Sequence, residues 1–218
     1  GEIALDVQIK KGWNWFSINL HLDDGITLSE VFKDWTPCDE DMIKSATATS
    51  TYFEGVWYPE AFAIEPGKGY QIMSSVEETV SIRLTGAPVE SSFEIPLKES
   101  WNWLGYTGTT AVDVQSAFAD DVVFSDDDLL KSGTTSVTYF DGQWWGDLKL
   151  EPGKGYQLYL ANATTVKYKP ASDVAAVALL SEDVGPGWTR NEHLNNMTVY
   201  AKVQNAAGVA YEDEGSVL

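Results

Sequence analysis

The chain has 218 residues, of which 33 are acidic and 14 are basic, so its formal net charge at pH 7 is −19. Such a charge repels phosphate backbones and anionic lipid headgroups, so we expect neither a nucleic acid nor a membrane as partner. Cys38 is the sole cysteine, which excludes an internal disulfide and a CxxC metal site. The sequence has no run of about 18 apolar residues and no basic start leading into an apolar signal region.

Alternation of polar and apolar residues predicts half-buried strands along most of the chain. Short helical turns are expected over residues 28–34 and 112–119. The two-residue period dominates, so the expected fold class is all-β. In chain order, the strands are expected at residues 2–10, 13–20, 79–84, 101–106 and 164–168.

Turn residues lie between these strands at regular places. The acid-glycine pairs at 54–55 and 141–142 are flanked by aromatic, β-favouring residues, which is a hairpin signal. The Pro-Gly-Lys-Gly segments at 66–69 and 152–155 supply the fixed and positive φ values of a tight turn. We therefore expect two hairpins with aromatic residues on both arms, and a strand after each Pro-Gly-Lys-Gly turn.

The most informative feature is an internal repeat. Four motifs occur twice in the same order. The separation between the copies is 88 residues at the first motif, from Trp13 to Trp101, and 86 at the last, from Pro66 to Pro152. The motifs are Trp-Asn-Trp at 13–15 and 101–103, Lys-Ser at 44–45 and 131–132, Thr-Tyr-Phe-acid-Gly-x-Trp at 51–57 and 138–144, and Glu-Pro-Gly-Lys-Gly-Tyr at 65–70 and 151–156.

The repeat divides the chain into three expected segments. Residues 1–88 and 89–170 form two tandem homologous β-rich repeats, each a small sandwich-like or barrel-like fold. Residues 171–218 form a linker and a short C-terminal β segment, either truncated or paired to an edge of the second repeat. The chain opens at Gly1 and stops where a strand begins, so we expect a piece of a longer polypeptide whose signal and anchor lie outside it.

The four motifs in this order resemble a Trp-rich tandem repeat module found in long secreted or surface proteins of environmental bacteria and archaea. The resemblance covers roughly residues 10 to 170. It implies an extracellular or cell-surface location and a role as a spacer or binding unit beside other domains. It implies no shared catalytic residue.

Aromatic residues are the first candidates for a binding site, because a sugar ring stacks on flat indole or phenol faces. Neighbouring residues on a strand point to opposite faces, so one ring of each adjacent pair cannot share the core of the other. The alternative is that both faces are covered, by the sheet and by the neighbouring repeat. The candidate stacking residues are Trp57, Tyr58, Trp144 and Trp145.

The tryptophans of the first motif are expected in a different environment. Each pair is separated by one asparagine, so both of its rings lie on the same face of a strand. We expect these rings to pack in the core of each repeat. They are Trp13, Trp15, Trp101 and Trp103.

Acidic runs are candidate calcium ligands, because calcium is bound by clustered carboxylate and carbonyl oxygens. None of the runs has the spacing of an EF-hand loop, and solvated surface charge explains them equally well. Calcium is therefore the one cofactor that the sequence suggests. The candidate ligands are Asp23, Asp24, Asp126, Asp127 and Asp128.

Catalytic motifs are not apparent. His21 and His193 belong to no nucleophile motif, and Cys38 has no counterpart in the second copy. A glycosidase would need two carboxylates in one cleft, and the acids here occur in runs instead. We expect a non-catalytic protein with a structural or adhesive role and with other surface proteins or a polysaccharide as partners. A carbohydrate-binding module and a glycosidase remain the alternatives.

Overall fold

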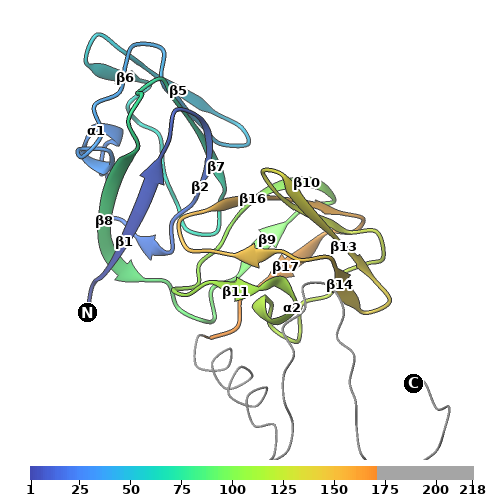
Figure 1. Ribbon diagram of the computed structural model, residues 1–218. Helices are drawn as coiled ribbons and strands as arrows, with labels where there is room; N and C mark the ends of the chain where they lie inside the picture. Colours follow the sequence, from blue (N-terminus) through green and yellow to red (C-terminus); the bar gives the residue numbers. More distant parts are fainter. Residues whose placement is uncertain (171–218) are drawn as a thin grey trace, which may run out of the picture. The chain divides into compact units, whose positions relative to one another are not determined.

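The computed structural model describes residues 1–170, and the short β segment expected within 171–218 lies outside the described residues (Figure 1). Antiparallel sheets are the main regular structure of the described chain. The prediction of an all-β fold is confirmed. The expected helical turns are present as single turns, α1 (Leu28–Val31) and α2 (Val114–Ala117).

The first repeat is built from two sheets. A five-stranded sheet has the order β2-β7-β4-β5-β6, and a three-stranded sheet has the order β1-β8-β3. Every pairing in them is antiparallel. The strands are β1 (Ile3–Ile9), β2 (Gly12–Phe16), β3 (Leu20–His21), β4 (Met42–Lys44), β5 (Thr49–Phe53), β6 (Val56–Tyr58), β7 (Tyr70–Ser74) and β8 (Val80–Pro88).

The second repeat has a five-stranded sheet of corresponding order, β10-β16-β12-β13-β14, and two-stranded sheets β17-β9 and β11-β15. The four motifs occupy corresponding strands and turns in the two five-stranded sheets. No sheet within residues 1–170 closes into a barrel. The strands are β9 (Ile95–Leu97), β10 (Ser100–Gly105), β11 (Val112–Asp113), β12 (Leu129–Ser132), β13 (Thr135–Phe140), β14 (Gln143–Trp145), β15 (Lys149–Leu150), β16 (Gly155–Leu160) and β17 (Thr164–Val166).

Each repeat has its own hydrophobic core. The first core draws its buried residues from 5–84 and the second from 95–168. Most of the buried residues are aliphatic, and each core also contains a tryptophan: Trp57 is only 2% exposed in the first and Trp144 only 5% exposed in the second. Burying an indole removes about 200 Å² from water, which contributes about 5 kcal/mol at 25 cal/mol per Å².

The hairpin prediction is confirmed in both repeats. The registers Phe53↔Val56 and Phe140↔Gln143 leave two-residue loops. Glu54 and Gly55 have φ of 48° and 88°, and the corresponding Asp141 and Gly142 have 50° and 80°. Positive φ at both central residues is what a type I′ turn requires, and this turn matches the twist of the flanking strands.

Reciprocal backbone contacts join the two repeats. The amide of Gly69 donates to the carbonyl of Trp103 at 3.0 Å, and the amide of Gly105 donates to the carbonyl of Gly67 at 3.0 Å. In the opposite direction, the amide of Ser17 donates to the carbonyl of Gly153 at 3.1 Å. The Pro-Gly-Lys-Gly turn of each repeat therefore binds the end of the Trp-Asn-Trp strand of the other.

Glycine is needed at this junction because the backbones approach closely. A Cβ placed on Gly105 would lie 2.6 Å from the carbonyl oxygen of Lys68, and one on Gly155 would lie 2.7 Å from that of Phe16. The sequence indicated a turn for these motifs, and Gly67 and Gly153 do have φ of 80° and 82°. Contact with the other repeat is a second role that turn chemistry does not reveal.

Candidate functional site

The aromatic pairs after the hairpins divide between the two faces of their sheets. Trp57 and Trp144 are buried, whereas Tyr58 is 60% exposed and Trp145 is 56% exposed. The expectation that neighbouring rings point to opposite faces is confirmed. The prediction that Trp57 and Trp144 stack on a sugar is wrong, because other aromatic rings cover both. The ring centroids of Trp35 and Tyr52 lie 5.8 and 5.3 Å from that of Trp57, and the ring centroid of Phe124 lies 4.9 Å from that of Trp144.

The core assignment of the four Trp-Asn-Trp tryptophans is also wrong. Trp13 is 52% exposed and Trp101 is 40% exposed, while Trp15 and Trp103 are half-buried. Period-two alternation correctly placed each pair on one face, but that face is the outer one. We call the face of each five-stranded sheet turned away from its core the outer face.

Asparagine occupies the position that faces inward between each tryptophan pair. The Asn14 side chain accepts from the amide of Lys10 at 2.9 Å and donates to its carbonyl at 2.7 Å. Asn102 makes the same two bonds with Lys98, at 3.1 and 2.8 Å. A polar group can be buried at low cost when its hydrogen bonds are made. The asparagine amides therefore occupy the inner side of each strand, bonded to the backbone that precedes it, and the indoles on either side point outward.

Strand register places four of the exposed rings, those of Trp13, Tyr58, Trp101 and Trp145, at the ends of one row on each outer face. In the first repeat the row runs from β2 to β6, and in the second from β10 to β14. Paired residues on neighbouring strands point to the same side of a sheet. The rows are Trp13, Met73, Met42, Thr51 and Tyr58, and Trp101, Tyr159, Leu129, Thr138 and Trp145.

A second row on each face contains hydrogen-bonding side chains. Trp15 pairs with Gln71 and Gln71 with Lys44; in the other repeat the corresponding residues are Trp103, Gln157 and Lys131. The Lys44 ammonium lies 4.9 Å from the Trp13 ring centroid, and that of Lys131 lies 5.1 Å from the Trp101 ring centroid. Each outer face thus combines flat rings with an amide and an ammonium group.

The charge of the outer faces differs from that of the whole chain. The strands of the two five-stranded sheets contain no aspartate or glutamate, although the chain has 33 acidic residues. Their charged residues are Lys44 and Lys131. A chain with net charge −19 therefore keeps carboxylates off the strands that carry its exposed aromatic rows.

The acidic runs have structural partners instead of a shared metal position. Asp128 is 1% exposed, and its carboxylate accepts from the amides of Ser125 at 2.8 Å and Ala161 at 2.7 Å. Asp126 accepts from the amide of Asp141 at 3.0 Å, at the hairpin turn.

The first repeat uses its acidic run in the same way. Asp41 is fully buried and accepts from the amides of Cys38 at 2.9 Å and Ser75 at 2.7 Å. Asp39 accepts from the amide of Glu54 at 2.9 Å. Each run thus stabilises the loop and turn that surround it.

The calcium candidates do not form a group in the described residues. Asp127 has an exposed side chain and a φ of 71°, and Asp23 and Asp24 are both exposed in the loop before α1. Within residues 1–170, no three or more histidine, cysteine, aspartate or glutamate side chains gather where they could hold a metal ion. The geometry offers no position where these acids act together.

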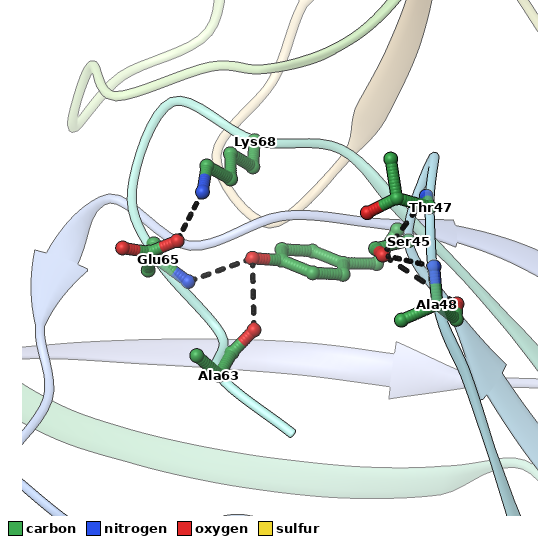
Figure 2. A network of polar contacts seen from close by, with 7 residues as sticks. Ser45, Thr47, Ala48, Ala63, Glu65 and Lys68 are labelled. Atoms are coloured by element: carbon green, nitrogen blue, oxygen red, sulfur yellow. Dashed lines mark hydrogen bonds and ion pairs between the residues drawn. The ribbon is translucent and has the colours of Figure 1, made fainter. Parts of the chain in front are cut away.

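The Glu-Pro-Gly-Lys-Gly-Tyr motif of the first repeat is held together by local polar contacts, and Figure 2 shows how Ala63, Glu65 and Lys68 lie among them. The Tyr70 hydroxyl accepts from the amide of Glu65 at 2.8 Å and donates to the carbonyl of Ala63 at 3.3 Å. Burial raises the pKa of Tyr70 to about 12. Lys68 forms an ion pair with Glu65.

The second copy of the motif has corresponding bonds. The Tyr156 hydroxyl accepts from the amide of Glu151 at 2.7 Å and donates to the carbonyl of Lys149 at 3.2 Å. Lys154 forms an ion pair with Glu151. The motif is thereby explained by turn and junction structure, without a ligand.

Groups that could serve an enzyme are dispersed. His21 lies 3.7 Å from Glu90, and Cys38 is exposed. A shallow cavity of about 420 Å³ in the second repeat has Asp113 and Asp147 in its lining. Both of these acids are exposed, whereas the general acid of a glycosidase works from a desolvated setting.

Comparisons with known proteins add no identification. No protein-family model, curated protein or solved structure matches this chain. Among residues 1–170, no helix is long and apolar enough to span a membrane.

Proposed function

We propose that this chain is a non-catalytic binding module of a larger secreted or cell-surface protein, and that it adheres to carbohydrate through its two outer faces. The observation that carries the proposal is the pair of corresponding rows with exposed rings at both ends. Trp13 and Tyr58 end the first row, and Trp101 and Trp145 end the second.

The chemistry of these faces suits sugars. A pyranose has an apolar face that packs on an indole or phenol ring, and its hydroxyls need donors and acceptors at the ring edge. Gln71 and Gln157 place an amide on each face beside the tryptophans. Neither amide makes a side-chain hydrogen bond to another part of residues 1–170, so both have bonding capacity left for a ligand.

Polysaccharide binding can be tested on the whole chain by affinity electrophoresis and tryptophan fluorescence against soluble and insoluble polysaccharides. We expect retardation and a change in fluorescence with at least one polymer. Replacing Trp101 with alanine should weaken binding by about tenfold, on the scale of roughly 1–3 kcal/mol that the stacking of a nucleobase on an aromatic ring contributes. The matched control is Val123→Ala, which trims a side chain that is 72% exposed on a loop outside the sheets.

A second function, that of a rigid spacer, is favoured by the reciprocal junction. The backbone bonds between the repeats limit bending between them, because each repeat contributes both a turn and a strand end. If the wild-type chain binds no polysaccharide in the panel, the carbohydrate proposal fails and the spacer role stands in its place.

A further inference from the structure

The tryptophans of the two outer faces meet at the junction. β2 and β10 are edge strands of their sheets, and the ring centroids of Trp15 and Trp103 are 4.9 Å apart with an interplanar angle of 73°. Alternate residues on a strand are about 6.8 Å apart, so Trp13 extends the contact in one repeat and Trp101 in the other. We call these four residues the tryptophan strip.

The strip is one surface shared by both repeats. Its four rings extend over a distance on the order of 18 Å, which is the separation of alternate residues along each of the two strands added to the distance between the Trp15 and Trp103 rings. A monosaccharide would cover only one ring, whereas a linear polymer can stack along the whole strip. Linked weak contacts of this kind raise affinity without any new type of contact.

Lysines define the charge of the strip. Lys44 lies against Trp13 and Lys131 against Trp101. Within residues 1–170 neither ammonium has a carboxylate within 4.0 Å, while most other basic side chains, such as Lys11 and Lys154, are paired with acids. The cation–π contacts hold both ammonium groups at the strip, so less side-chain freedom is lost when an anion binds there.

We infer that the tryptophan strip binds a single chain of an acidic polysaccharide, with sugar faces on the indoles and carboxylates on Lys44 and Lys131. This inference rests on the proposed function and names its ligand class. A neutral polymer would leave two desolvated ammonium groups without an anion, which costs affinity.

A polysaccharide with a low density of carboxylates fits the tryptophan strip best. Two lysines can neutralise only a few carboxylates, and the net charge of −19 on the whole chain repels a polymer that carries a negative charge at every residue. The same reasoning disfavours single-stranded nucleic acid, whose recognition needs a positively charged groove that follows every phosphate. The ligand class is therefore a linear polysaccharide in which uronate residues are spaced among neutral sugars.

The test compares one polymer in two forms: a linear, sparsely uronate-substituted polysaccharide, and the same polymer after its carboxyl groups are reduced to alcohols. Affinities of the full chain are measured by fluorescence titration at low and physiological salt. We expect the native polymer to bind about tenfold more tightly than the reduced one, with the difference shrinking as salt rises.

Variants locate the charge effect. The double variant Lys44→Gln and Lys131→Gln should bind the native and the reduced polymer with equal affinity. The control is the double variant Lys33→Gln and Lys149→Gln, which removes two exposed lysines outside the five-stranded sheets and should keep the preference.

The outcomes separate the inference from the proposed function. Equal binding of both forms overturns the inference and leaves carbohydrate binding intact, whereas binding of neither form overturns both. Tighter binding of oligo-thymidylate than of the native polymer also overturns the inference, in favour of nucleic acid. Titration with an oligosaccharide long enough to cover the strip should give one molecule bound per chain, and two per chain would contradict a single strip.

Discussion

Asp128 is the residue for which the structure makes the sharpest prediction about stability. Its buried carboxylate receives the amides of Ser125 and Ala161 on its two oxygens. Asp128→Asn keeps the shape of the side chain but turns an amino group toward one of these amide donors. The loss of one charge-assisted hydrogen bond costs about 1.5–3 kcal/mol, and the amide left without a partner adds about 1 kcal/mol or more. We therefore expect a loss of about 3 kcal/mol.

Urea unfolding followed by tryptophan fluorescence measures this loss. With a slope of about 2 kcal/mol per M, the midpoint for the second repeat should fall by about 1.5 M. The matched control is Asp127→Asn, at an exposed position whose positive φ asparagine tolerates well. Equal midpoints for the two variants would refute the structural role of Asp128. A rise of the wild-type midpoint in calcium that Asp127→Asn abolishes would show that the run is a cation site after all.

Three other changes test the junction, the motif tyrosine and the hairpin. Gly155→Ala should lower stability by about 1–3 kcal/mol, as overpacking does, because its Cβ would meet the Phe16 carbonyl. Gly1→Ala, whose Cβ would have no neighbouring atom within 4 Å, is the control in the same unfolding assay. Burial raises the pKa of Tyr70 from 10.0 to about 12, so its contribution is complete below pH 10 and is lost as pH rises through 12. That contribution is about 3 kcal/mol, and thermal unfolding should show Tyr70→Phe with a smaller loss at high pH than the wild type. Gly142→Ala meets no neighbouring atom but must adopt a φ of 80°, so urea unfolding should show a cost of roughly 1–2 kcal/mol.

Features set by a few neighbouring residues could be predicted from the sequence. The hairpins at 53–56 and 140–143 follow from an acid-glycine pair that accepts positive φ between β-favouring arms. The strands follow from the two-residue period. Both depend on backbone preferences within a short window, and tertiary packing did not override them.

The choice of sheet face could not be predicted in the same way. A two-residue period shows that Trp13 and Trp15 share a face, but it does not say which face meets the core. Hydrophobicity alone favours burying the indoles. The face that meets the core is decided by Asn14, whose side-chain amide forms hydrogen bonds with the Lys10 backbone on the inner side of the sheet. Those bonds depend on the conformation of the chain before the strand, which residue type alone does not give.

Comparison of the two repeats separates structural residues from candidates for binding. Motif residues present in both copies fall into groups that the structure accounts for: Trp57 and Trp144 fill the cores, while the tyrosines and glycines of the last motif hold its turn and the junction. Folding requires these residues whatever the protein binds. Residues that both copies share without such a role include three pairs on the outer faces: Trp13 and Trp101, Lys44 and Lys131, and Gln71 and Gln157. Their common position on strands without acidic residues, in a strongly acidic chain, supports our proposal of a ligand that contacts both repeats at once.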